Sequence, residues 1–185
     1  MDTFEAIKTR YSVGKVKADA VPRDVIEKLL DAGNQAPNHY KVRPWRFIVL
    51  TGNARNKLGD VMAASFADHN PGLPPEGLDK TRALPLRAPV LIVVGVDKPA
   101  EAKVLEIENL SAASAACENI LLAAHALGLG AKWRTGDWAR DAKVKELLGL
   151  AADQLIAGFI YIGYPEFESE IKERPSFEDR VVWME

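Results

Sequence analysis

The chain has 185 residues, of which 48% are hydrophobic and 27% are charged, and its formal net charge is −2. This length and composition are typical of one globular domain with a real core, and they exclude collagen-like, coiled-coil and disordered proteins. The near balance of charge also removes the overall electrostatic signature of a protein that binds nucleic acid or an anionic membrane.

The cysteine and histidine residues and the hydropathy of the chain exclude further classes of protein. The lone cysteine, Cys117, excludes an internal disulfide, and the three histidines are far apart, so no metal site is predicted. The first residues lack the basic start and apolar run of a secretion signal. The longest apolar stretches, such as residues 89–96, have the length of a strand and not of a membrane span. We therefore expect a cytoplasmic protein.

The first third of the chain alternates helix, loop and strand. In order, the pattern predicts a short helix starting near Asp2 or Thr3, a helix between Pro22 and Gly33, a loop over residues 34–44, a strand over residues 46–51, and a third helix capped by Asn53.

Residues 70–89 contain five prolines, so this segment cannot be regular throughout. A connection of this length inside a compact chain is usually functional or mobile, and a solvated linker without a role is the alternative. The apolar run over residues 90–96 then predicts a strand buried on both faces.

A long helix is predicted from about Lys103 to Leu127. Its centre, residues 111–117, consists of small side chains, which favours a buried position close to other backbone. The remaining predicted elements are a strand over residues 130–134, a capped helix over 141–148 and a core strand over 155–164. The polar tail beyond Pro165 closes with the apolar residues 181–183, which suggests that it reaches a neighbouring surface, such as a second subunit.

Familiar catalytic patterns are absent: there is no P-loop, no complete dinucleotide-binding fingerprint and no nucleophile elbow. The acidic residues Glu106, Glu108 and Glu118 are interpreted as a solvated helix face, and His125 as a packing or capping residue. We therefore predict no acid–base or nucleophile constellation. Polar residues such as Arg10 and Ser12, Asn38 to Lys41, and Trp133 to Thr135 instead lie in loops or at strand ends, which favours a pocket for a phosphorylated, flat ligand.

These segments resemble those of one family in their order along nearly the whole chain. The matching segments are Arg10-Tyr11-Ser12, Ala36-Pro37-Asn38-His39, Pro44-Trp45-Arg46-Phe47-Ile48-Val49, Leu86-Arg87-Ala88-Pro89, Gly130-Ala131-Lys132-Trp133-Arg134-Thr135-Gly136 and Gly158-Phe159-Ile160-Tyr161-Ile162-Gly163-Tyr164-Pro165. Together they are similar to the nitroreductase family of FMN-dependent oxidoreductases, and most of all to its small, minimal bacterial members.

The resemblance implies one α+β domain over residues 1–185, with a mostly antiparallel central sheet flanked by helices. It also implies a homodimer that exchanges its C-terminal tails and binds FMN at each of two subunit interfaces. The expected partners are NAD(P)H and a small electron acceptor of the nitroaromatic or quinone type. Hydride would pass from NAD(P)H to FMN and electrons from FMN to the acceptor.

The resemblance also implies roles for individual residues. Arg10, Tyr11 and Ser12 would hold the phosphate and ribityl chain of FMN, with a further phosphate contact from Arg174. The flavin ring would lie against a second set of residues, namely Gln35, His39, Trp133, Arg134, Thr135 and Gly136. Of these, His39 would come from the other subunit.

The chain departs from the family pattern in two segments. Gly14 replaces a basic residue of many relatives, and Lys41 and Arg43 replace an Asn and a Gln, so the contact to the flavin N1 and O2 edge is left open, with Lys41 as one candidate. Two further functions also stay open: a flavin store or sensor without turnover, and a family variant with another flavin reaction, such as dehalogenation.

Overall fold

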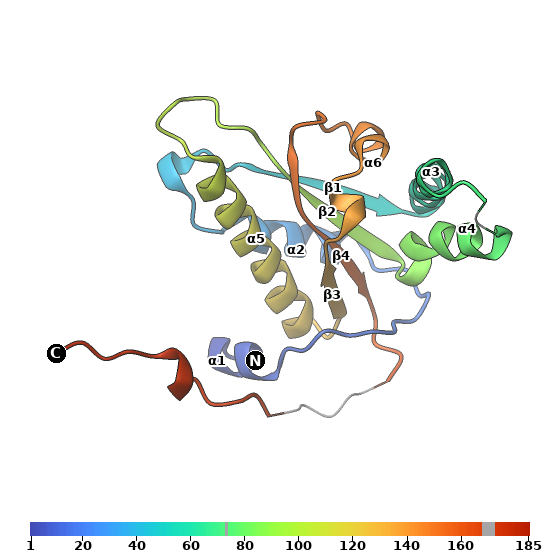
Figure 1. The fold of residues 1–185 in the computed structure, drawn as a ribbon. Coiled ribbons are helices and arrows are strands. Elements are labelled where there is room, and N and C mark those ends of the chain that lie inside the picture. Colours follow the sequence, from blue (N-terminus) through green and yellow to red (C-terminus); the bar gives the residue numbers. More distant parts are fainter. Residues whose placement is uncertain (73, 168–172) are drawn as a thin grey trace.

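The protein, described here from a computed structural model, is an α+β structure built on one four-stranded antiparallel sheet (Figure 1). The structure describes residues 1–72, 74–167 and 173–185. The strand order is β1-β2-β4-β3, with bounds β1 Trp45–Thr51, β2 Val90–Val96, β3 Gly130–Arg134 and β4 Leu155–Gly163. The predicted fold class is thereby confirmed.

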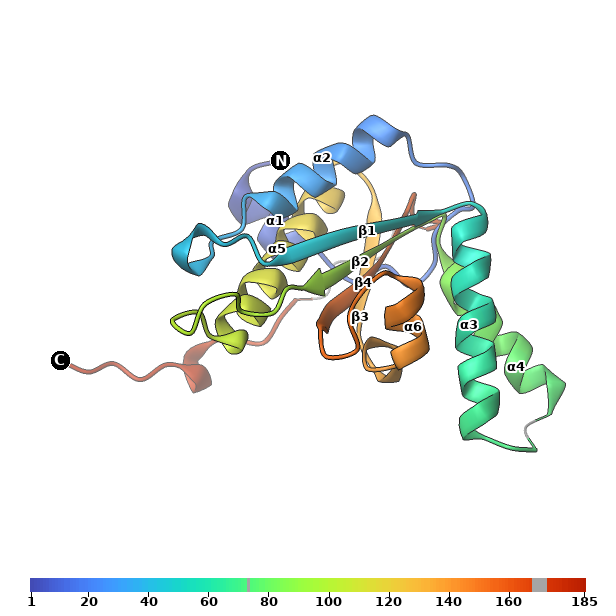
Figure 2. The ribbon, with the colours of Figure 1, turned by 90° about the horizontal axis from the view of Figure 1, so that it is seen from above.

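Helices cover both faces of this sheet (Figures 1 and 2). Within the described residues the α-helices are α1 Thr3–Thr9, α2 Arg23–Asn34, α3 Asn53–His69, α4 Pro75–Arg82, α5 Glu106–Ala126 and α6 Ala142–Leu147. Four short 3-10 helices accompany them: η1 His39–Lys41, η2 Leu84–Arg87, η3 Asp137–Ala139 and η4 Glu178–Arg180. No described helix has the length and hydropathy needed to cross a membrane.

Strand β2 is buried along its whole length, as its unbroken apolar run predicts. Its side chains alternate between two hydrophobic clusters because successive residues of a strand point to opposite faces. Ile92 and Val94 pack with α2 and α5 on one face, while Leu91 and Val93 pack with α3 and α6 on the other. The sheet therefore separates two cores that both depend on β2.

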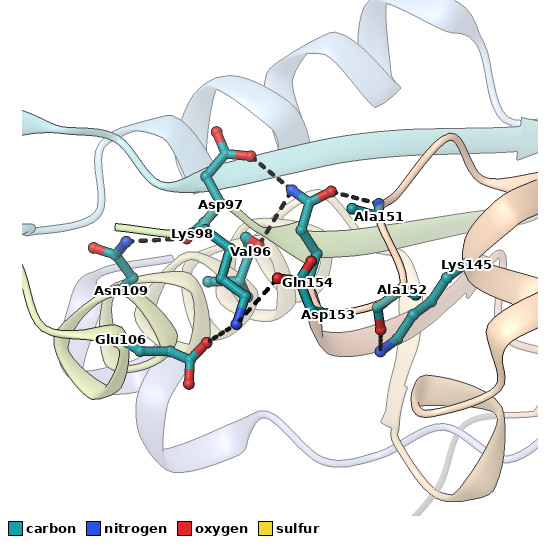
Figure 3. A network of polar contacts seen from close by, with 10 residues as sticks. All are labelled: Val96, Asp97, Lys98, Glu106, Asn109, Lys145, Ala151, Ala152, Asp153 and Gln154. Atoms are coloured by element: carbon teal, nitrogen blue, oxygen red, sulfur yellow. Dashed lines mark hydrogen bonds and ion pairs between the residues drawn. The ribbon is translucent and has the colours of Figure 1, made fainter. Parts of the chain in front are cut away.

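The central helix α5 begins at Glu106, three residues later than predicted, and polar contacts fix this end of it (Figure 3). Asn109 donates a hydrogen bond to the backbone carbonyl of Asp97 (3.0 Å), and Gln154 donates one to the side chain of Asp97 (3.1 Å). Lys98 pairs with Glu106 at 2.7 Å. The start of α5 is thus tied to the end of β2 and the beginning of β4.

The proline-containing segment 70–89 holds more regular structure than its composition suggests. Its described residues form α4, where Pro75 occupies the first turn, and then η2. Helix α4 crosses α3 so closely at Gly59 that a β-carbon there would lie 2.1 Å from the carbonyl oxygen of Arg82. This crossing packs the segment against the hydrophobic cluster on the α3 and α6 face of the sheet.

Two capping predictions have different outcomes. Asp141 caps α6 as predicted, because its side chain accepts a hydrogen bond from the backbone N–H of Val144 (2.9 Å). The prediction for α3 was wrong: Gly52, at φ 48°, is the cap, and Asn53 is already the first helical residue. Glycine tolerates this left-handed conformation at no steric cost, so the chain turns there without a side-chain cap.

Residues 13–17 run along the far edge of the sheet and connect it to the start of the tail. The backbone N–H of Val13 donates to the carbonyl of Ala131 on β3 (3.0 Å), and Val16 forms an antiparallel bridge with Pro165. Strand β1 forms the opposite edge, and its outer side has no strand partner in the described part of the chain. Among the described residues, the chain itself therefore covers the β3 edge of the sheet and leaves the β1 edge without a strand partner.

Candidate functional site

Arg10 lies where α1 ends, and its side chain points toward α5. Its backbone N–H donates to Ala6 (3.0 Å) and closes the helix, while its Nε donates to Oε1 of Glu118 (3.1 Å). The Arg10 side chain is 19% exposed and that of Glu118 is 44% exposed. The interpretation of Glu118 as part of a merely solvated face was wrong. The two residues are 108 positions apart, so no local pattern could have paired them.

A second contact between α1 and α5 lies close by. The hydroxyl of Thr9 is 2.6 Å from the carbonyl of Glu5 and 2.7 Å from Nε2 of His125. Because the hydroxyl has one proton and the carbonyl can only accept, the hydroxyl donates to Glu5 and accepts from His125 Nε2–H. Glu118 and His125 are seven residues apart, which places them on the same face of α5. The seven-residue spacing therefore predicts from sequence that Glu118 and His125 share a face, and in the structure both face the end of α1.

We expect His125 to make the folded protein less stable in mild acid. Burial lowers the pKa of its imidazole below the ordinary value of 6.5, and the neighbouring positive charge of Arg10 lowers it further, against a smaller opposite effect of Glu5. The unfolded chain therefore takes up this proton near pH 6.5, whereas the folded chain does so only at lower pH. Stability is lost as the pH falls through that window. His125→Gln should flatten the fall in melting temperature between pH 7.5 and 5, and an unchanged slope would contradict this assignment.

A cavity of about 250 Å³ opens beside Arg10. Arg174 from the tail adds to this region, because its Nη2 donates to the backbone carbonyl of Arg10 (2.7 Å). Ser12 is exposed two residues further along. The cavity lining comprises Arg10, Tyr11, Val13, Leu121, His125, Gly128, Leu129, Ala131 and Pro165. The structure thus brings Arg10, Tyr11 and Arg174 together, although Arg174 follows Arg10 by 164 residues.

Three cations surround the neighbouring position, Gly14. A small cavity of about 40 Å³ is lined by Gly14 together with Arg87, Lys132, Arg134 and Tyr161, among others. A β-carbon at Gly14 would meet nothing within 4 Å. Burial raises the pKa of the Tyr161 hydroxyl, while the charges of Arg134 and Arg87 act in the opposite direction. Sequence reasoning missed Arg87 and Lys132, although Lys132 and Arg134 share one face of β3 by strand alternation.

No hydrogen bond or ion pair joins these three cations to an acidic side chain within residues 1–72, 74–167 and 173–185. Positively charged side chains that line the same small cavity repel one another, and an anion bound beside them would relieve that repulsion. The region beside Gly14 is therefore positive, although the chain as a whole is slightly acidic.

Trp133 turns toward the core rather than toward this cavity. Its indole occupies the space above Gly158, where a β-carbon would lie 1.9 Å from Nε1, and that nitrogen donates to the carbonyl of Ala157 (3.0 Å). The next residues, Arg134, Thr135 and Gly136, are exposed, and Gly136 has a φ of 94°. In this segment the backbone beyond Trp133, and not the indole, is accessible to a ligand.

The loop carrying Gln35 and His39 lies at a different place. Asn38 and His39 line a cavity of about 340 Å³ against Ser111, Ala112 and Ala115 of α5. His39 itself lies toward the start of α5, where its Nδ1 is 3.6 Å from Oε1 of Glu108. Glu108 precedes Glu118 by about three helical turns, or about 15 Å along the helix axis. One chain therefore does not bring this loop to Arg10. It presents two separate clusters along the same helix.

The polar residues of this loop face outward. Gln35 is exposed and donates to Asp31 of its own helix (3.2 Å). Lys41 and Arg43 are also exposed and have positive φ angles of 57° and 47°. Lys41 lies on the His39 loop and does not line the cavity beside Gly14. Within one chain, the positive charges beside Gly14 come instead from Arg87, Lys132 and Arg134.

Metal and thiol chemistry have little support in the described residues. They contain no group of three or more His, Cys, Asp or Glu side chains arranged to hold a metal ion. Burial, together with the negative charge of the adjacent Glu118, raises the pKa of the Cys117 thiol to about 12, so this cysteine stays protonated at neutral pH.

Comparison with known proteins identifies the family. Residues 7–164 match the nitroreductase family, so the chain belongs to it. The chain is 30% identical over 169 residues to an Escherichia coli K12 protein named "Putative NAD(P)H nitroreductase YdjA", covering 91% of each. A nitroreductase-like family protein from Bacillus cereus superposes with a TM-score of 0.86 at 29% identity, over 100% of this chain and 97% of that one. A nitroreductase structure from Desulfovibrio desulfuricans, solved in complex with FMN, superposes with a TM-score of 0.75 at 28% identity, over 100% and 98%.

Proposed function

We propose that this protein is an FMN-dependent oxidoreductase that takes a hydride from NAD(P)H and passes electrons to small nitroaromatic or quinone-type acceptors. The family match, the YdjA name and the FMN-bound D. desulfuricans structure support this assignment. Among the chain's own features, the strongest support for this function is that Arg10 and Tyr11 line one cavity and that Arg174 bonds to the backbone of Arg10. The whole chain, residues 1–185, would act as one FMN-binding domain.

The chemistry of the Arg10 cluster fits a phosphate monoester. A guanidinium presents its donors in a planar fork that matches phosphate oxygens, and charge-assisted bonds of this kind are roughly twice as strong as neutral ones. Arg10 retains its two Nη groups for this purpose because, among the described residues, only its Nε is engaged. Ser12 would donate its hydroxyl, and Arg174, whose Nη2 already reaches Arg10, would add a second positive charge.

The flavin ring would lie along the exposed segment Arg134 to Gly136, with the cations around Gly14 toward its pyrimidine edge. Bound FMN supplies the hydride-accepting and electron-donating chemistry itself, while the protein supplies binding, orientation and charge. Arg87, Lys132 and Arg134 would stabilise negative charge on the reduced ring. We therefore assign no catalytic acid or base, in agreement with the absence of such a constellation from the sequence.

We also propose a homodimer in which two chains complete each FMN site. The His39 loop and the Arg10 cluster lie on different parts of α5, so a second copy of the chain would have to bring Gln35 and His39 to Arg10. Exposed apolar side chains support such an interface. They are Phe4 and Ile7 on α1, Leu105 and Ile107 at the start of α5, and Phe177, Val182, Trp183 and Met184 in the tail.

Deleting residues 181–185 should lower both the melting temperature and the retention of FMN. In the described chain Val182 is 85% exposed and Trp183 is 81% exposed, and the tail extends away from the body (Figures 1 and 2). The free outer side of β1 can accept an added strand, so we propose that each tail pairs with β1 of the other subunit. Sedimentation velocity with full-length and truncated protein tests this. A stable, flavin-loaded monomer of the full-length chain would refute the dimer.

The decisive experiment for the function is anaerobic reduction. The purified protein should be yellow, NADPH or NADH should bleach it rapidly without air, and a quinone or nitroaromatic should restore the colour. A yellow protein that NAD(P)H does not bleach would instead be a flavin store or sensor. Bleaching without recovery on either acceptor would favour a family variant with another flavin reaction, such as dehalogenation. A colourless protein that binds no FMN would refute all three.

A further inference from the structure

The bond between Arg10 and Glu118 uses one particular edge of the guanidinium. Glu118 accepts from Nε at 3.1 Å, and no other hydrogen bond involves the Arg10 side chain in the described part of the chain. A guanidinium carries five N–H donors in one rigid plane, so fixing Nε also fixes the direction of the four Nη–H groups. The Nη groups have no hydrogen-bond partner among the described residues, and Arg10 lines the cavity of about 250 Å³.

The backbone around Arg10 is held by other contacts. Thr9 bonds to His125 on the same face of α5, and Arg174 donates to the carbonyl of Arg10. The first contact anchors the end of α1 through the Thr9 side chain, and the second holds the main chain at Arg10. The orientation of the mostly buried guanidinium depends on Glu118 alone among the described residues. Backbone placement and side-chain direction at position 10 therefore have separate causes.

We propose that Glu118 is a positioning residue that directs the Nη groups of Arg10 toward the phosphate of FMN; this inference rests on the phosphate site proposed above. Its negative charge also repels a phosphate, but a carboxylate that is 44% exposed is strongly screened by water. Orientation therefore outweighs repulsion. A neutral acceptor at position 118 keeps the orientation and removes the repulsion.

The inference is tested by titrating FMN and riboflavin into apoprotein variants. Glu118→Ala should bind FMN about three- to tenfold more weakly, the equivalent of one lost hydrogen bond. Glu118→Gln should bind FMN at least as tightly as the parent, because its amide oxygen still accepts from Nε. Riboflavin, which lacks the phosphate, should bind all three proteins equally. Glu106→Ala, on the same helix but paired with Lys98, is the matched control and should leave FMN affinity unchanged.

A double substitution separates positioning from a general effect on the fold. In an Arg10→Ala background, Glu118→Ala should cause no further loss of FMN affinity, since the group that it orients is gone. Melting temperatures of all variants show whether the fold is intact, which we expect because Glu118 is half-exposed.

Several outcomes overturn the inference. FMN affinity that is unchanged or raised in Glu118→Ala means that Glu118 only opposes the phosphate. An equal loss for FMN and riboflavin means a structural role, and an equal loss in the Ala and Gln variants means that charge, not orientation, matters. In each case the parent still binds FMN, so the proposed function survives. A parent protein that binds no FMN refutes the function itself.

Discussion

Replacing Arg10 by alanine should weaken FMN binding by about one to two decades without unfolding the protein. A charge-assisted hydrogen bond to phosphate contributes roughly 1.5–3 kcal/mol, which corresponds to about a 10- to 160-fold change in affinity. The loss should be near the upper end, because the Arg10 side chain is mostly buried and poorly screened by water. Titration of the apoprotein with FMN measures the change.

The fold should survive because the structural contacts at position 10 come from its backbone. The N–H of residue 10 still closes α1 on Ala6, and the carbonyl still accepts from Arg174. Glu118 loses its partner but remains half-exposed, so water can solvate its charge. Arg23→Ala is the matched control, since Arg23 is an exposed arginine on α2 paired only with Glu27. Equal FMN affinity in the Arg10 variant and the parent would remove Arg10 from the site.

Gly59→Ala should lower the melting temperature by about 3–10 °C. Two effects of opposite sign compete at this position. Alanine is favoured over glycine inside a helix by about 1 kcal/mol. A β-carbon at Gly59 would, however, lie 2.1 Å from the carbonyl oxygen of Arg82, which is backbone and cannot rotate away. Overpacking costs about 1–3 kcal/mol, and so short a contact with backbone belongs at the upper end of that range. The clash therefore outweighs the gain by about 2 kcal/mol, and each kcal/mol lowers the melting temperature by about 2–4 °C in a chain of this size.

Thermal unfolding monitored by circular dichroism tests this prediction. Gly14→Ala is the control, because its β-carbon meets nothing within 4 Å and Gly14 has no positive φ. That variant should melt within a degree or two of the parent. A Gly59→Ala protein that is as stable as the parent, or more stable, would show that α4 can move away from α3 at little cost.

The elements that sequence predicts well are those decided by local chemistry. Seven consecutive apolar residues specify β2 because only a strand buried on both faces can accept them, and Asp141 caps α6 through a bond three residues away. The long helix was also predicted, but its start was placed three residues early, at Lys103 instead of Glu106. That end of α5 is held by contacts of Asn109 with Asp97 and of Glu106 with Lys98, which a local pattern does not contain.

The candidate site is less accessible to sequence because its partners are far apart along the chain. Glu118 looks like one more solvated carboxylate until the fold brings Arg10 against it. Arg87 and Lys132 reach the surroundings of Gly14 from two different elements. The sequence also does not show where the side chain of Trp133 packs. In the structure its indole occupies the space that a β-carbon at Gly158 would fill.

Helix α5 contacts two different groups of residues along its length. The cavity lined by His39 lies toward its start, and Glu118 and His125, which bond to Arg10 and Thr9, lie toward its end. In a dimer built as proposed, each cofactor would draw its phosphate contacts from one chain and its His39 loop from the other. Damage at the two clusters would then be complementary. A chain defective at Arg10 and a chain defective at His39 would, when paired, assemble one site with both defects and one site with none. Two inactive alleles of this gene would in that way restore activity to each other, whereas two alleles altered in the same cluster would not.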